Sequence, residues 1–226
     1  VEYKPLFLAS NGALTFEEPA ATSSSDEYVS DPKKPVPFTK DITVGWPGHT
    51  WMIEDQRFVS TRPDVLVYRS EVLEDDLTIA GPILANLFIS STGSDADFFV
   101  KLIDEFPGDI PESSGDAASM AGQQMLVGVE VMRAKYRDNF EFPQPLEPGV
   151  VTPISFNIWD KFHTFKKGHR IMVQIHSSWF PAYDRNPQQF TDIYRALPED
   201  YKTATQRIHR SKDAASNLVL PVLIAN

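Results

Sequence analysis

Residues 168–187, GHRIMVQIHSSWFPAYDRNP, decide the fold of this chain, and their first half predicts a β-strand. Apolar side chains alternate there with polar or mixed ones, as Ile171, Val173 and Ile175 against Met172, Gln174 and His176. A period of two places the two sets on opposite faces of a strand. We therefore expect the first set to point into a hydrophobic core.

The second half of the stretch predicts an aromatic loop. Three aromatic side chains stand among charged and amide residues, and Pro181 and Pro187 restrict the backbone. Aromatic side chains bury much area at little cost in rotamer entropy, which suits an interface. The alternative is a loop that folds back on the protein's own core. The candidate interdomain or binding loop comprises Trp179, Phe180, Tyr183, Asp184, Arg185 and Asn186.

Length and composition favour one β-rich domain. The chain has 226 residues, and 42% of them are hydrophobic, which is enough for one sizeable core. Fifteen Phe and four Trp favour a layered β core, and 18 Pro argue against long helices. We divide the chain into residues 1–41, with entry strands and an extended Pro-rich connection, and residues 42–226, the sandwich proper. Together they form one domain overall.

Charge and residue content exclude several kinds of partner. The formal net charge is −10, which disfavours nucleic acid and anionic membrane surfaces. No apolar run approaches the length of a membrane span, and no signal peptide is expected at Val1. Without cysteine there is no disulfide framework and no thiolate site. Cytoplasmic, periplasmic and secreted locations all stay open.

Eight to ten short strands with turn signals between them predict an all-β sandwich or jelly roll. Residues 79–82 are expected to break the run of strand. Residues 200–209 fit either a short helix or a polar strand, and the pattern does not decide between them. Pro221 predicts that the last strand lies at a sheet edge. The strands are expected at residues 3–8, 13–16, 65–68, 72–73, 83–90, 98–106, 125–131, 154–159, 171–176 and 218–224.

The familiar catalytic and cofactor motifs are absent from the sequence. There is no Gly-x-Ser-x-Gly elbow, no P-loop and no Gly-x-Gly-x-x-Gly, and the five histidines form no His-x-x-x-His pair. We expect no cofactor and no metal. Asp95 and Asp97 have a spacing that can hold calcium, but a solvated turn is favoured because no ligand series continues it. His169 is interpreted as a side chain that caps backbone carbonyls.

Two further patterns allow glycan chemistry. Asp104 and Glu130 lie in predicted strands, and a facing pair of carboxylates can cleave a glycosidic bond. The sequence does not place them opposite each other. Four tryptophans could line a sugar-binding face or belong to the core, at Trp46, Trp51, Trp159 and Trp179.

An ordered set of short motifs resembles the C-terminal jelly-roll domain of the CocE/NonD hydrolases. That group includes cocaine esterase, α-amino-acid ester hydrolases, X-Pro dipeptidyl-peptidases and enzymes named glutaryl-7-aminocephalosporanic acid acylases. The motifs run along nearly the whole chain: PLFL at 5–8, GALTF at 12–16, Tyr28 with DP at 31–32, PVP at 35–37, EDQRF at 54–58, RPDVLVY at 62–68, IAGP at 79–82, SDADFFVKLID at 94–104, MRAKYR at 132–137, and residues 168–187.

The resemblance implies a galactose-binding-like jelly roll that follows an α/β-hydrolase domain with a helical cap. In the group, the catalytic Ser, Asp and His lie in that upstream domain, so no catalytic residue carries over to this chain. The implied partner is the α/β-hydrolase domain, and self-association is a further possibility. The alternatives are a carbohydrate-binding module, which shares the architecture, and a free-standing glycan-active hydrolase.

Overall fold

The computed structural model describes residues 1–41, 49–109 and 120–224, and nearly all of its regular structure is β-strand. Within these residues the helical elements are short: α1 (Arg57–Ser60) and the 3-10 turns η1 (Ser10–Gly12), η2 (Thr50–Met52), η3 (Ala134–Tyr136), η4 (Ile193–Arg195) and η5 (Pro198–Asp200). None of these helices is long enough to cross a membrane. The strands are β1 (Glu2–Ala9), β2 (Ala13–Thr15), β3 (Ser25–Ser30), β4 (Leu66–Arg69), β5 (Leu77–Ser91), β6 (Asp97–Glu105), β7 (Gln124–Arg133), β8 (Thr152–Phe165), β9 (Arg170–His176), β10 (Ala204–Ser211), β11 (Ala214–Ala215) and β12 (Asn217–Val222).

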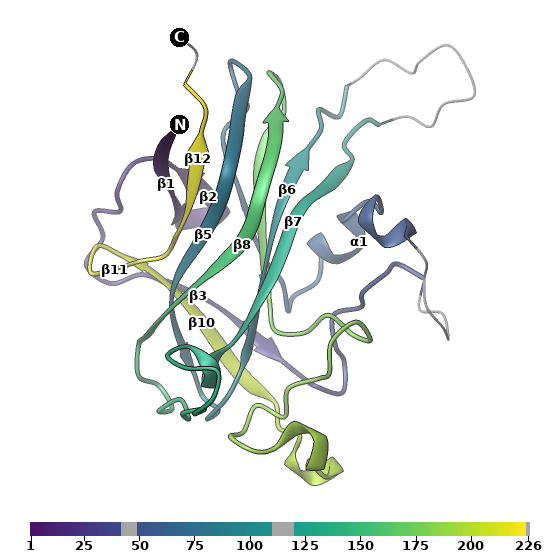
Figure 1. Ribbon diagram of the computed structural model, residues 1–226, viewed down its shortest axis with the longest axis vertical. Coiled ribbons are helices and arrows are strands. Elements are labelled where there is room, and N and C mark those ends of the chain that lie inside the picture. The colour runs from purple at the N-terminus through teal and green to yellow at the C-terminus, as the bar shows by residue number, and fades with distance from the viewer. Residues whose placement is uncertain (42–48, 110–119, 225–226) are drawn as a thin grey trace.

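The strands form a β-sandwich, which confirms the predicted all-β class (Figure 1). One hydrogen-bonded path runs β11-β10-β5-β12-β1-β2-β4-β9-β6-β7, with β3 beside β10 and β8 beside β5. The main hydrophobic core takes side chains from both halves of this path. The half around β5 therefore packs face to face on the half around β9 and β6.

The strand β9 is buried on both faces. Ile171, Val173 and Ile175 are fully buried in the main core, as their alternation predicted. The opposite face is also buried, because Gln174 and His176 have no exposed surface either. A third layer therefore covers the outer side of β9 and its neighbours.

This covering layer consists of residues 31–41, 49–65 and 177–187. Figure 1 shows its helix α1 beside β6 and β7. The first and last segments are joined, because the Phe38 amide donates to the Phe180 carbonyl at 2.8 Å and the Val36 amide to Ser178 Oγ at 2.8 Å. The chain between residues 17 and 41, interpreted above as an extended connection, thus contributes β3 to the sheet and part of this layer.

The interruption predicted at residues 79–82 was wrong, because β5 runs straight through it. Gly81 adopts φ +132°, a conformation open mainly to glycine. The pairing of β5 with β8 shifts register between Pro82 and Leu84, which is a bulge. A bulge bends a strand without ending it, so turn-forming residues do not mark a boundary here.

Pro221 does not lie at a sheet edge. Its strand, β12, pairs with β1 on one side and β5 on the other. The ladder to β5 shifts register between Val219 and Val222, so the proline occupies an irregular position where a backbone donor is not needed. Residues 204–211 form a strand, β10, which resolves the ambiguity between helix and strand.

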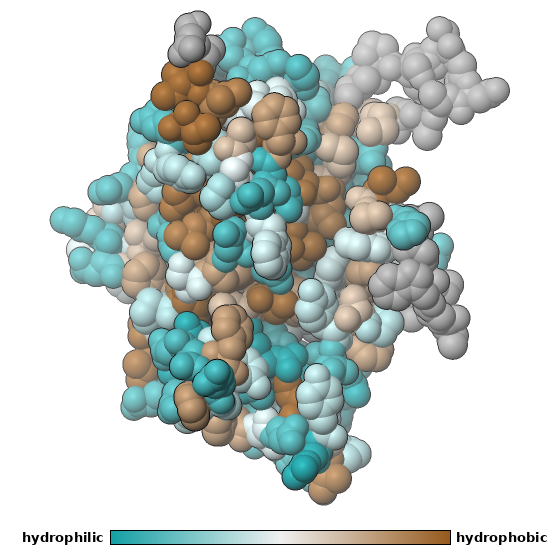
Figure 2. Space-filling view, in the orientation of Figure 1, coloured by the Kyte–Doolittle hydropathy of each residue, from teal (hydrophilic) through white to brown (hydrophobic). Residues whose placement is uncertain are grey.

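A second bulge changes the face of the sheet to which the side chains of β7 point. Its pairing with β6 shifts register between Leu102 and Ile103. Val127 packs against the main core, whereas Val129 and Val131 pack against the covering layer. A strict period of two would place these valines on one face, but one extra residue reverses the alternation. β8 alternates regularly only from Ile154 to Ile158, because its own bulge at Trp159 breaks the alternation. Hydrophilic and hydrophobic residues intermingle on the surface in Figure 2.

Candidate functional site

The predicted aromatic loop divides into a buried and an exposed part. Trp179 is only 4% exposed, and its ring centroid lies 4.6 Å from that of Phe38 and 5.6 Å from that of Trp51. Phe99 of β6 completes this cluster. Trp179 therefore fixes the covering layer to the sheet, which is the second of the two alternatives left open by the sequence.

Phe180 and Tyr183 remain at the surface, with 39% and 38% of their area exposed. The guanidinium of Arg185 lies 5.5 Å from the centre of the Phe180 ring and donates to the Pro32 carbonyl at 3.0 Å. Asp184 is exposed, and the described residues give it no ion pair. The outer part of the loop is thus held in place while its aromatic rings stay accessible.

Asn186 belongs to a buried ionic cluster. Its amide donates to Asp97 Oδ1 at 2.7 Å, and Arg133 donates to the two oxygens of the same carboxylate at 3.0 and 3.1 Å. Beside this pair, Lys135 Nζ lies 3.4 Å from Asp95 Oδ2. We call Asp95, Asp97, Arg133, Lys135 and Asn186 the Asp97 cluster.

The solvated turn favoured for residues 94–97 was wrong, because Asp95 is fully buried and Asp97 is 1% exposed. Burial raises the pKa of Asp95 to about 6, and it raises the pKa of Asp97 despite the opposing Arg133 charge. The cations already neutralise both carboxylates. The described residues contain no grouping that could hold a metal ion, and the Asp97 cluster serves to join β6, β7 and the aromatic loop.

His169 binds a carboxylate and not backbone carbonyls, which corrects the sequence interpretation. Its Nδ1 lies 2.8 Å from Asp104 Oδ1, and Nε2 of His163 lies 2.9 Å from Oδ2 of the same residue. Asp104 is 2% exposed. One buried carboxylate on β6 thus bridges β8 and the start of β9.

The register separates Asp104 from Glu130. Asp104 pairs with Met125, whereas Glu130 pairs with Val100, four residues earlier on β6. At the rise of a strand this is about 13 Å, beyond the spacing at which two carboxylates cleave a glycosidic bond. Glu130 instead accepts a hydrogen bond from the indole of Trp159. The two carboxylates therefore form no glycosidase pair.

The four tryptophans also do not form one face. Trp51 and Trp179 pack in the covering layer, whereas Trp159 is 66% exposed on β8. Its φ of +61° places it in the left-handed region at the bulge, which aims its ring at Glu130 on β7. Trp46 lies outside the described residues.

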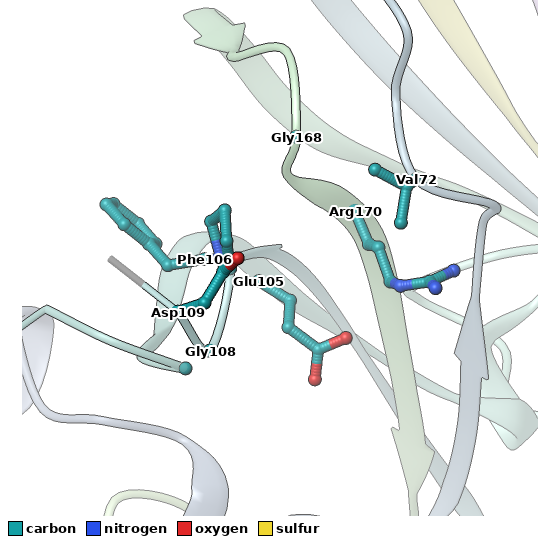
Figure 3. A pocket seen from close by; sticks show the side chains of 9 residues that line it. Val72, Glu105, Phe106, Gly108, Asp109, Gly168 and Arg170 are labelled. Atoms are coloured by element: carbon teal, nitrogen blue, oxygen red, sulfur yellow. The ribbon is translucent and has the colours of Figure 1, made fainter. Parts of the chain in front are cut away.

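A surface hollow of about 630 Å³ lies at the end of β6 and the start of β9 (Figure 3). Its walls are Val72, Glu105, Phe106, Pro107, Gly108, Asp109, Gly122, Gly168 and Arg170. The Glu105 carboxylate is already bound by Arg69 at 2.8 Å and by the amide of Gln124 at 2.8 Å. These walls carry no nucleophile paired with a base, so the hollow lacks the means for acyl transfer.

The described residues do include a Ser–His hydrogen bond, between Ser90 Oγ and His209 Nε2 at 2.9 Å. Ser90 is 2% exposed, so a substrate carbonyl cannot approach it. In the described part of the chain no carboxylate is hydrogen-bonded to His209 to orient its ring. A buried Ser–His pair without an orienting acid and an open face is a structural contact.

The fold and these contacts define a class: a β-sandwich domain whose described residues include no exposed serine hydrogen-bonded to a histidine. Residues 1–219 match the family model of the X-Pro dipeptidyl-peptidase C-terminal non-catalytic domain. The chain belongs to this family, and it is a C-terminal domain of the CocE/NonD hydrolase type. The resemblance drawn from the sequence motifs is thereby confirmed.

Three relatives show how much of a longer protein this domain represents. Cocaine esterase from Rhodococcus sp. is 34% identical over 98% of this chain and 38% of its own. An aminopeptidase from the marine sediment archaeon Thaumarchaeota archaeon is 41% identical with a TM-score of 0.93, over 99% of this chain and 37% of its own. An α-amino acid ester hydrolase is 42% identical with a TM-score of 0.92, over 98% and 36%. The chain thus spans little more than a third of each relative.

Proposed function

We propose that this chain is the non-catalytic β-sandwich of a larger serine hydrolase, where it braces an α/β-hydrolase domain that carries the catalytic serine. The observation that carries the proposal is the match over 98–99% of the chain to hydrolytic enzymes nearly three times its length. The missing nucleophile elbow supports it, because the chemistry must then reside in the remainder of the parent protein.

The covering layer is the surface that we assign to docking of the catalytic domain. Besides Phe180 and Tyr183 it exposes Met52 and Ile53, at 45% and 73% of their area. Large apolar side chains with polar residues around them are typical of interface anchors. Asp184 and Arg185 stand at the same surface and can bind polar groups of the partner domain.

The substrate class proposed for the parent protein is an ester or amide whose acyl group carries a free α-amino group. The two structural relatives above 40% identity are named for an amino acid ester hydrolase and an aminopeptidase, and both names imply such a substrate. Phenylglycine methyl ester and phenylacetic acid methyl ester differ in that amino group. We expect the parent protein to hydrolyse the first at least tenfold faster. Equal rates would assign it to general ester hydrolysis.

The docking assignment is tested by comparing two melting-temperature shifts. Phe180→Ala and Tyr183→Ala should lower the melting temperature and the activity of the full parent protein, because they remove interdomain contacts. The same variants in this chain alone should shift the melting temperature little.

Two further variants serve as controls. Trp179→Ala should destabilise both proteins, because Trp179 is buried within the chain itself. Tyr194→Ala, at a side chain that is 85% exposed on η4, should affect neither. Equal shifts for Phe180→Ala and Tyr183→Ala in the two proteins would place those side chains in the sandwich's own packing and refute the docking assignment.

Carbohydrate binding is the second candidate, favoured by the exposed Trp159 ring. It lies in a surface groove of about 490 Å³ that Glu130, Asn157 and Phe140 also line. Aromatic rings beside hydrogen-bonding side chains are a common way to hold a ligand. A glycan-binding screen decides this point: binding that Trp159→Ala abolishes would support it, and no binding would dismiss it.

A further inference from the structure

Lys101 is a buried lysine without an acidic partner. It lies on β6, has no exposed surface and points into the covering layer, where Nζ is 2.8 Å from Gln56 Oε1. The Trp179 ring centre is 4.9 Å from the same nitrogen. Among the described residues no carboxylate lies within ion-pair distance of it. Buried lysines are normally paired, so this one needs an explanation.

Some of the polar atoms around Lys101 lack hydrogen-bond partners. Gln174 is its direct cross-strand neighbour, and His176 lies two residues further along β9, opposite Phe99. Within the described structure, Gln174 Oε1 and Trp179 Nε1 are buried and make no hydrogen bond, and the His176 ring has no side-chain partner, although it interacts with the Ser178 backbone. Such orphaned atoms are rare in protein interiors, and each needs an explanation such as a bound water, an ion or a functional role.

Lys135 provides an internal comparison. It is also buried, at 6% exposure, but its Nζ lies 3.4 Å from Asp95 and donates to the Thr191 carbonyl at 3.0 Å. The chain therefore gives one buried lysine a carboxylate and leaves the other with an amide oxygen. The two lysines therefore differ in the groups around their Nζ atoms and not in how deeply they are buried.

We propose that Lys101 is a modification site that takes up carbon dioxide to form a carbamate. The Nζ lone pair forms a bond to the carbon of carbon dioxide, and one C=O π bond breaks and leaves its electron pair on oxygen. The nitrogen loses one proton, which passes to water, because the pKa of the neighbouring His176 is too low for that ring to hold it. The sum is an amine and carbon dioxide giving a carbamate anion and a proton, with no oxidant or reductant.

The carbamate would satisfy the groups that the free amine leaves unpaired. Its two oxygens are acceptors, the indole N–H of Trp179 is an unused donor, and the neutral His176 ring has no side-chain partner. The Gln174 side chain can turn its amide NH₂ toward the same oxygens. A charged acceptor receives the strongest of such hydrogen bonds, which offsets part of the cost of burying it.

The amine is also in a reactive state near neutral pH. Burial lowers the pKa of Lys101 to about 7, opposed by the charge of Glu54. At pH 7 a large fraction of the molecules therefore carries Lys101 as the neutral, nucleophilic amine. The other ionisable groups around the site are His176 on β9 and Arg62 in the covering layer. Burial and the Lys101 charge hold the pKa of His176 well below its usual value, so the ring is neutral.

The test is ¹³C NMR of the full chain in ¹³C-bicarbonate at pH 8, followed by trapping with triethyloxonium and peptide mass analysis. We expect a carbamate resonance, and the trapped adduct should map to Lys101 and not to Lys135. The resonance should weaken as pH falls toward 6, because the amine becomes protonated. No adduct at Lys101 at saturating carbon dioxide would overturn the proposal. This measurement uses the wild-type chain, so it does not depend on whether a variant folds.

Two variants test the assigned donor. Trp179→Phe keeps the ring and removes the N–H, and it should lower carbamate occupancy roughly tenfold at subsaturating carbon dioxide. Trp51→Phe, in the same aromatic cluster, is the matched control and should leave occupancy unchanged. A resonance that persists in Lys101→Met, or an equal loss in both tryptophan variants, would refute the assignment.

Discussion

Asp95 shows how a single carboxylate changes character when the chain folds around it. The side chain is fully buried beside Asp97 and Lys135, and burial raises its pKa to about 6. A carboxyl with a raised pKa holds more protons in the folded state than in the unfolded state. Its contribution to stability is therefore greatest at low pH and falls as pH rises from about 4 to 6.

Replacing Asp95 with Asn should remove this pH dependence. The variant should gain free energy of unfolding relative to the wild type as pH rises across that window, by at most about 1.4 kcal/mol per pH unit. Urea unfolding at pH 4.5, 5.5 and 6.5 measures the difference. A difference in unfolding free energy between the two proteins that stays constant with pH, or that shifts toward the wild type as pH rises, would contradict the raised pKa of Asp95.

At the scale of the element, β9 contributes buried side chains to the layers on both of its faces. Ile171→Ala should cost about 2–4 kcal/mol of unfolding free energy through the cavity that it leaves in the main core. Val29→Ala, on β3 and 55% exposed, is the control and should cost little. Denaturant unfolding measures both. A loss below about 0.5 kcal/mol at Ile171 would contradict the core assignment.

The bulged strand β5 depends on glycine for another reason. Gly81→Ala should cost about 1–3 kcal/mol, because its φ of +132° strains any residue with a Cβ atom. The nearest atom to that Cβ would be Pro221 Cβ at 3.5 Å, an ordinary contact, so the cost is conformational and not steric. Gly108→Ala, where a Cβ would meet nothing, serves as the control. Equal thermal stability of the two variants would disprove this explanation.

At the scale of the whole molecule, the chain should be inert toward acyl substrates. We expect no turnover of p-nitrophenyl acetate or of dipeptide amides by the chain alone, because no exposed serine is paired with a base in its described residues. Spectrophotometric assay with and without a fluorophosphonate checks this. Steady turnover that the fluorophosphonate blocks would reveal a nucleophile in the chain and remove the basis of the bracing role.

The sequence by itself determined the class of the fold, the core face of β9 and the family. Alternating Ile and Val positions depend only on the period of a strand, so Ile171 and Ile175 were placed without knowing their partners. The ordered motifs identified the family without any catalytic residue. The absence of a nucleophile elbow could likewise be established from the amino-acid sequence, since that motif spans only five consecutive residues.

Only the tertiary structure decided which side chains meet across the sheet. Asp97 meets Asn186 and Arg133, and Asp104 joins two histidines, although nothing in the local pattern of these residues announces a partner. Burial of Trp179 likewise depends on residues 31–41, which arrive from far away in the sequence. Short-range patterns record the period of a strand, whereas contacts between distant residues arise from the register and bulges of the assembled sheets. The burial of Lys101 without an acidic partner is visible only in that assembly, because a lysine in a strand normally reaches solvent.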